Sequence, residues 1–98
     1  MNIIRNQNGM TLEITLEGRL DTTTAPELEK ELKDSLDGVD ALTLDFAKLD
    51  YISSAGLRVL LSAHKAMSKK DGMKVVNVNE IVQEVFDVTG FADILTIE

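Results

Sequence analysis

Two segments of the chain alternate regularly between apolar and polar residues. One is Thr11–Glu17 and the other is Ala41–Phe46. A period of two residues is typical of a β-strand with one buried face. We therefore expect both segments to be strands, the first with Leu12, Ile14 and Leu16 facing a core.

Three shorter apolar segments are also expected to form strands. The turn dipeptide Asn8-Gly9 follows Ile3–Arg5, so the first two strands of the chain are predicted to form a hairpin. The other two expected strands are Met73–Val78, which is rich in β-branched valine, and the short, mostly apolar segment Ile94–Ile97.

Three segments between these strands carry apolar residues at helical spacing. The predicted helices run over about Ala25–Leu36, Ser54–Lys70 and Glu80–Thr89. Hydroxyl residues and a first-turn proline, Pro26, mark the beginning of the first helix. A glycine follows each predicted helix, and the three are Gly38, Gly72 and Gly90.

The order of the predicted elements is ββαβαβαβ. A predicted helix connects Ala41–Phe46 to Met73–Val78, so these two strands are expected to be parallel. We predict the α/β fold class, with three helices packed on a mixed sheet of four or five strands. No linker, repeat or low-complexity segment divides the 98 residues, so residues 1–98 are expected to form one domain. The loops at the carboxyl ends of the parallel strands are the expected functional edge.

The net charge narrows the choice of partners. Seventeen acidic and ten basic residues give a formal charge of −7, which repels a phosphate backbone, so nucleic-acid binding is not expected. Basic residues nevertheless gather along the second predicted helix, where one face carries Arg58, Ser62, Lys65 and Lys69. This face is either a solvated helix surface or a contact surface for an acidic partner.

The composition also indicates a compartment. The chain contains no cysteine, so neither disulfides nor thiolate metal sites contribute to it. Residues 1–8 lack the apolar run of a signal peptide, and no window approaches the ~20 apolar residues of a membrane span. We expect a cytoplasmic protein without a membrane span that is monomeric when free.

Two hydroxyl residues, Ser53 and Ser54, stand where a strand-loop ends and an apolar helix begins. A side-chain oxygen at this place can cap the helix by accepting from an unpaired backbone N–H. The exposed amides and the helix dipole also favour a negative group such as phosphate. The pair is therefore a candidate helix cap, a candidate nucleophile or a candidate phosphate acceptor.

Nucleophilic catalysis is not expected. A serine nucleophile needs a base within hydrogen-bond reach, and the only histidine, His64, lies ten residues beyond Ser54 on the same helix, about 15 Å away. A helical wheel places His64 among Leu57, Leu60 and Leu61, which indicates a partly buried residue. No G-x-S-x-G motif is present. The sequence thus disfavours a hydrolase.

Metal and nucleotide sites are not expected either. Asp21, Asp45 and Asp50 could converge near the serines, but aspartates without histidine or EF-hand spacing usually form turns and caps. Neither a Walker A motif nor G-x-G-x-x-G is present. We predict no metal, no cofactor and no enzymatic activity, so any enzyme involved would act on this protein.

Two motifs and the order of elements resemble the STAS domain family, in particular the bacterial anti-sigma factor antagonists. The segment Gly18–Asp21 resembles the G-x-[LI]-D turn of that family before its first helix. The segment from Leu44 to Leu57 resembles its L-D-[LF]…V-x-[YF]-[IM]-D-S-[ST/A]-G-L signature. The resemblance extends over nearly all of the chain and implies the STAS fold.

The family resemblance implies a phosphorylated serine. In that family a partner protein that is both a kinase and an anti-sigma factor modifies the serine before the [ST/A]-G-L triplet, and alignment on Gly56-Leu57 puts it at Ser54. The family commonly has aspartate at the position of Ser53. Because this chain has a serine there instead, Ser53 is a competing acceptor. Arg58 stands where glycine is frequent, four residues past Ser54, and could pair with a phosphate there.

The resemblance also implies a partner switch. The unphosphorylated form would bind the anti-sigma factor serine kinase and release sigma factor, phosphorylation of Ser54 would reverse the binding, and a PP2C-like phosphatase could restore it. The alternatives are a non-switching STAS scaffold subunit of a lipid-transport ATPase or sensory complex, and a small enzyme. The predicted partner-binding residues are Asp21, Thr22, Ser53, Ser54, Ala55, Gly56, Leu57 and Arg58.

Overall fold

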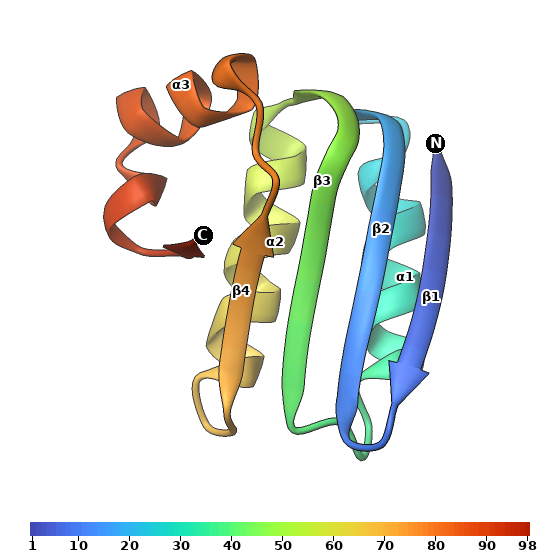
Figure 1. The fold of residues 1–98 in the computed structure, drawn as a ribbon. Helices are drawn as coiled ribbons and strands as arrows, with labels where there is room; N and C mark the ends of the chain where they lie inside the picture. The colour runs from blue at the N-terminus through green and yellow to red at the C-terminus, as the bar shows by residue number, and fades with distance from the viewer.

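The computed structural model describes all 98 residues and contains five strands, three α-helices and one 3-10 turn (Figure 1). In chain order these are β1 (Asn2–Asn8), β2 (Thr11–Leu20), α1 (Ala25–Ser35), β3 (Ala41–Ile52), α2 (Ser54–Met67), β4 (Gly72–Val76), α3 (Glu80–Thr89), η1 (Phe91–Asp93) and β5 (Thr96–Ile97). The strands form one sheet in the order β1-β2-β3-β4-β5. β1 and β2 form the antiparallel hairpin, and the other pairs are parallel. The predicted fold class and element order are confirmed.

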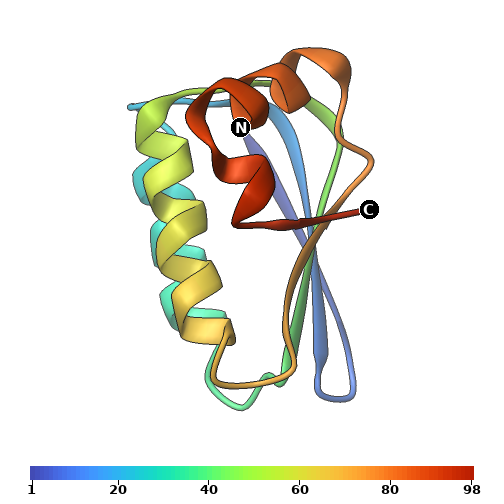
Figure 2. The ribbon, with the colours of Figure 1, turned by 90° about the vertical axis from the view of Figure 1, so that its left-hand side faces the viewer.

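The strand order explains where the helices lie. Each crossover moves the chain one strand further in the same direction, and crossovers between parallel strands are right-handed, so the connecting helices fall on one face of the sheet. α1 and α2 cover that face, whereas α3 lies at the end of the sheet beyond β4 (Figures 1 and 2). The junctions that lead from β2, β3 and β4 into the helices therefore gather at one end of the molecule.

The core lies between the sheet and the two covering helices. The predicted inward residues Leu12, Ile14 and Leu16 are fully buried, which confirms that prediction. Of the apolar positions proposed for the second helix, Leu57 and Leu60 are buried while Leu61 is only half-buried. The predicted basic face is exposed, at Arg58, Ser62 and Lys65 of α2, and Lys69 is exposed in the turn after this helix.

β3 is twice as long as the alternating pattern predicted, because it continues past Phe46 to Ile52. The pattern is interrupted at Ala47 and Lys48, which are both exposed. The register with β2 shifts at this point and shifts again further on, as expected for β-bulges. A bulge interrupts the period of two residues. The alternating pattern therefore ended at Phe46, although the strand continues. β2 is also longer and reaches Leu20.

Other predicted boundaries were also wrong, and β1 extends over Asn2–Asn8 instead of Ile3–Arg5. The second helix ends at Met67 instead of Lys70, and the Lys70 ammonium donates to Leu36 O and Val39 O, at 3.1 and 2.7 Å, closing the loop after α1. β4 stops at Val76, two residues before the predicted end. The last predicted strand shrinks to Thr96–Ile97, because Ile94 N and Leu95 N both donate to Phe91 O in the turn that ends η1.

None of the helices combines the length and apolar character needed to cross a membrane, and the longest, α2, has 14 residues.

One asparagine attaches α3 to the sheet. The Asn79 side chain caps α3 by accepting from Val82 N at 2.8 Å, and its Nδ2 donates to Leu49 O of β3 at 2.7 Å. Only Val82 and Phe86 of α3 are buried. The position of α3 therefore depends strongly on this residue.

Asn79→Ala is expected to lower the free energy of unfolding by about 1 to 2 kcal/mol, because it removes a helix cap and leaves the Leu49 carbonyl without its donor. Urea unfolding of both proteins measures the difference. The control is Gln83→Ala, which removes an exposed hydrogen bond to Asp87 within α3 and should cost no more than about 0.5 kcal/mol. Equal losses in the two variants would contradict the attachment.

Candidate functional site

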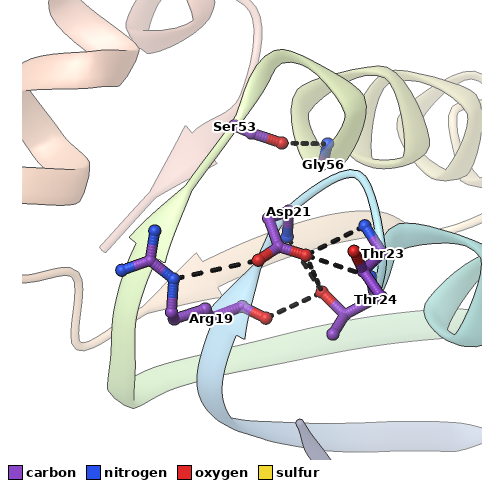
Figure 3. Close-up of polar contacts among 6 residues, drawn as sticks. All are labelled: Arg19, Asp21, Thr23, Thr24, Ser53 and Gly56. Atoms are coloured by element: carbon purple, nitrogen blue, oxygen red, sulfur yellow. Dashed lines mark hydrogen bonds and ion pairs between the residues drawn. The ribbon is translucent and has the colours of Figure 1, made fainter.

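Ser53 of the predicted serine pair lies where β2, β3 and the first turns of α1 and α2 meet (Figure 3), and Ser54 follows it as the first residue of α2. The last residue of β2, Leu20, accepts a hydrogen bond at its carbonyl from Ser53 N, at 2.9 Å. This bond ties the end of β2 to the single residue between β3 and α2. The segment after β2 and the start of α2 are thereby held side by side.

Ser53 is the N-cap of α2, as predicted. Its backbone is extended, with φ −102° and ψ 176°, and its Oγ accepts from Gly56 N at 3.5 Å (Figure 3). Its carbonyl accepts from Leu57 N at 2.9 Å, in the first helical turn. The half-buried Ser53 side chain is thus engaged in holding the start of the helix.

Ser54 is the first residue of α2 and its side chain is exposed. Its hydroxyl makes no hydrogen bond to another residue, in contrast to that of Ser53. The amides of Ser54 and Ala55 are among the N–H groups that a helix leaves unpaired at its beginning. No acidic side chain stands in the first turn of α2, so the positive end of the helix dipole is not compensated from within the helix.

Gly56 brings the helix into direct contact with the sheet. A Cβ at this position would lie 2.7 Å from Leu20 Cγ and 2.9 Å from Ile52 Cγ1, closer than carbon atoms can approach. Leu57 is also buried, with 5% of its surface exposed. Of the predicted partner-binding residues Ser54 to Leu57, only Ser54 and Ala55 therefore reach the surface, while Gly56 and Leu57 position them.

Asp21 organises the neighbouring turn after β2. Its Oδ1 accepts from the backbone N–H groups of Thr23 and Thr24 at 3.0 and 3.1 Å (Figure 3). The Thr24 hydroxyl accepts from Asp21 N at 2.9 Å and donates to Arg19 O at 2.7 Å. These bonds hold the turn that leads into α1 and leave Thr22 exposed at its tip.

The same contacts stabilise the ionised form of Asp21. The hydrogen bond from Thr24 N is the largest cause that lowers the pKa of Asp21, and the bonds from Thr23 N and the Thr24 hydroxyl and the charge of Arg19 act in the same direction, against partial desolvation. Arg19 Nε lies 3.8 Å from Asp21 Oδ2. Asp21 therefore contributes a fixed negative charge beside the serine pair.

Two residues of this region were not anticipated from the sequence. The Arg19 guanidinium stacks on the Tyr51 ring, with Cζ 4.5 Å from the ring centroid, which is cation–π geometry. The two residues are register partners on β2 and β3. Because the pairing depends on two β-bulges, no local sequence pattern could have indicated it.

Arg58 lies on the other side of the serine pair and is exposed. It forms none of the five ion pairs of the protein. Together with Thr22 and Ala55 it lines a shallow hollow of about 360 Å³ between the starts of α1 and α2. Three of the predicted partner-binding residues thus line one hollow, namely Thr22, Ala55 and Arg58, and the exposed Ser54 directly precedes Ala55.

Asp45 does not join this site, whereas Asp50 lies two residues before the end of β3 and is exposed. Asp45 is in register with Thr15 and Val76 and seven residues before the end of β3, about 23 Å along an extended strand. Its Oδ1 accepts from Ala47 N and from Asn77 Nδ2, at 2.9 and 3.0 Å. The predicted possibility that Asp45 converges with Asp21 near the serines was therefore wrong.

His64 is half-buried on α2, as predicted, and its Nδ1 is buried without a hydrogen-bond partner. It lines a second hollow at the opposite end of the sheet, with Ala41, Gly72 and Met73 at the starts of β3 and β4. The histidine and the serine pair belong to different parts of the surface.

Gly56→Ala is expected to destabilise the protein by about 1 to 3 kcal/mol, because the added methyl group overlaps Leu20 and Ile52. Leu20→Ala alone should cost about 2 to 5 kcal/mol through the cavity that it leaves. The double variant fills part of that cavity, so urea unfolding should show a loss smaller than the sum of the two. Additive losses would mean that Gly56 and Leu20 do not compete for the same space.

Asp21→Asn is expected to destabilise the protein near pH 7 but not in strong acid. Because the pKa of Asp21 is lowered by folding, its ionised form stabilises the fold above the unfolded-state pKa of 3.8, and the contribution is lost as the pH falls through the folded-state value. Chemical unfolding from pH 7 to pH 2 should therefore show the wild-type and variant curves converging in acid. A difference that stayed constant over this range would contradict a role for the charge.

Known proteins of similar structure share this arrangement of strands and helices. A crystal structure of an anti-sigma factor antagonist from Mycobacterium paratuberculosis superposes with a TM-score of 0.88 at 22% identity, covering 98% of this chain and 83% of that one. The Bacillus cell fate determinant SpoIIAA in its phosphorylated form gives a TM-score of 0.76 at 17% identity, covering 99% of this chain and 91% of that one. At these identities the similarity concerns the fold.

Comparison of sequences shows the family as well as the fold. The putative anti-sigma factor antagonist BtrV of Bordetella bronchiseptica is 39% identical over 84 residues, which cover 84% of this chain and 72% of BtrV. The sequence pattern of the STAS domain matches residues 2–98. The family match includes both β-to-α junctions that form the site, and the chain belongs to the STAS domain family, with anti-sigma factor antagonists among its relatives.

Proposed function

We propose that this protein is an anti-sigma factor antagonist whose binding to an anti-sigma factor serine kinase is switched by phosphorylation of Ser54. The observation that carries the proposal is the different state of the two serines. The Ser53 hydroxyl accepts a capping bond from Gly56 N, whereas the Ser54 hydroxyl is exposed and unpaired. The relationship to anti-sigma factor antagonists such as BtrV supports the proposed class of partner.

The modification is an ordinary phosphoryl transfer. The Ser54 oxygen attacks the γ-phosphorus of ATP, a new O–P bond forms, the bond to ADP breaks, and the hydroxyl proton passes to a base of the kinase. This chain supplies only the acceptor, so no catalytic residue of its own is required. A PP2C-like phosphatase would hydrolyse the ester and return the hydroxyl.

The phosphate would be tolerated in the free protein but not in a tight complex. It adds a charge of about −1.5 to −2 at the beginning of α2, where unpaired amides and the helix dipole favour an anion. Arg58, one turn further along the same helix and free of other ion pairs, is placed to balance part of this charge. At an interface packed against Ser54 and Ala55, the same charge must be desolvated, which opposes binding.

Incubation with the anti-sigma factor serine kinase of the same organism and Mg-ATP should add one phosphate, located on Ser54 by tandem mass spectrometry. Ser54→Ala should abolish the modification. The matched control is Ser53→Asp, which keeps a capping oxygen on α2 and restores the aspartate usual in the family. This control should be phosphorylated on Ser54, and a phosphate on Ser53 of the wild-type protein would refute the assignment.

Ser54→Asp should weaken the complex with the same kinase by at least about tenfold, since its carboxylate brings a negative charge into the interface. Isothermal titration calorimetry measures the affinity, with Ser54→Asn as the uncharged control of similar size. Equal affinity of the aspartate and asparagine variants would favour the alternative of a STAS scaffold that does not switch.

A further inference from the structure

α3 carries a second apolar surface in addition to its core face. Val82 and Phe86 are buried against the sheet. Ile81, Val85 and Val88 follow at helical spacing on an adjacent side of the helix. Ile81 is 61% exposed and Val88 is 77% exposed, while Val85 is half-buried.

This apolar stripe is unusual within the molecule. The chain has five large hydrophobic side chains that are exposed, and three of them are Ile81, Val88 and Ile94, the last directly after η1. The other two, Ile4 and Met10, lie in the hairpin at the other side of the sheet. The exposed apolar surface is therefore concentrated at α3 and η1. The core contacts of these elements leave these apolar side chains uncovered.

The charged side chains of α3 and η1 have one sign only. No lysine, arginine or histidine occurs between Val75 and Glu98. On a helical wheel the three acidic residues of α3 lie together along the edge of the stripe that faces away from the core, and none of them forms an ion pair with a basic residue. These three are Glu80, Glu84 and Asp87, and Asp93 of η1 is likewise without a basic partner.

We propose that the outer face of α3, with Ile81, Val85 and Val88 at its centre, is a docking surface for a basic amphipathic helix of a partner protein. Apolar residues of such a helix would cover the stripe, and its lysines or arginines would lie against the unpaired acids. A second copy placed α3 against α3 would oppose acid to acid. An anionic membrane or a nucleic acid would be repelled. The surface contains neither Ser54 nor Arg58, so the inference does not rest on the proposed switch.

A designed peptide tests the surface without knowledge of the natural partner. The probe is an 18-residue fluorescein-labelled helix with leucines on one face and lysines on the other, added to the full chain. A scrambled peptide of the same composition, which has no apolar face, controls for attraction to a protein of net charge −7. Binding is followed by fluorescence anisotropy and mapped by backbone amide NMR shifts.

The expected result is binding of the amphipathic peptide with shifts centred on residues 80–94. The double variant Ile81→Gln/Val88→Gln should weaken binding by at least about tenfold, and Glu84→Gln/Asp87→Asn should reduce both affinity and salt dependence. The matched control is Ile4→Gln/Met10→Gln, which removes the other two exposed apolar residues, 50% and 52% exposed, and should leave binding unchanged. All replaced side chains are exposed, so the variants are expected to fold.

Three outcomes would overturn the proposal. One is equal affinity for the scrambled peptide, and another is a shift pattern centred outside α3 and η1. The third is concentration-dependent dimerisation of the free protein that Ile81→Gln/Val88→Gln abolishes, which would make a second copy the occupant. Because these variants leave Ser54 and Arg58 unchanged, the phosphorylation assay with the same variants separates a failure of this proposal from a failure of the switch.

Discussion

The close contact between the first turn of α2 and the ends of β2 and β3 is the constraint on which the site depends. Gly56 lies against Leu20 and Ile52 without space for a Cβ. The Ser53 amide is bound to the Leu20 carbonyl. Together these contacts determine where β3 stops and α2 begins, because the helix and the strand ends cannot move relative to one another. It follows that Ser53 caps the helix and that Ser54 is its first exposed hydroxyl.

The helices differ in the sign of their exposed charges, a difference that the net charge of −7 does not show. α1 and α3 each carry a glutamate in the first turn, Glu27 and Glu80, which complements the helix dipole, whereas α2 has no acid there. α2 is the helix with the exposed basic face and α3 the one with the unpaired acids. The protein therefore presents two surfaces of opposite character, one suited to receive a negative group and the other suited to a basic partner.

Much of the fold could be predicted from local patterns. α3 was predicted with its observed bounds, because the residues from Glu80 to Thr89 keep helical spacing and Gly90 marks the end. The inward residues of β2 followed from alternation alone. The end of β3 could not be predicted, since its register with β2 shifts between Asp45 and Lys48 and again between Leu49 and Tyr51, and such bulges break the alternation. Lys70 was assigned to a helix, but its ammonium binds carbonyls more than thirty residues earlier, a contact with no local signal.

The sequence by itself determined the element order, the STAS resemblance and the presence of two hydroxyls at the start of a helix. Each of these features depends on residues that are neighbours in the sequence. Only the tertiary structure decided how the two serines differ. Contacts with β2 and β3 decide which serine caps the helix, how closely Gly56 approaches Leu20 and whether Leu57 is buried. These contacts involve residues that are distant in sequence. The same is true of the stripe on α3, since helical spacing shows that Ile81 and Val88 share a side, but only packing shows that nothing in the chain covers it.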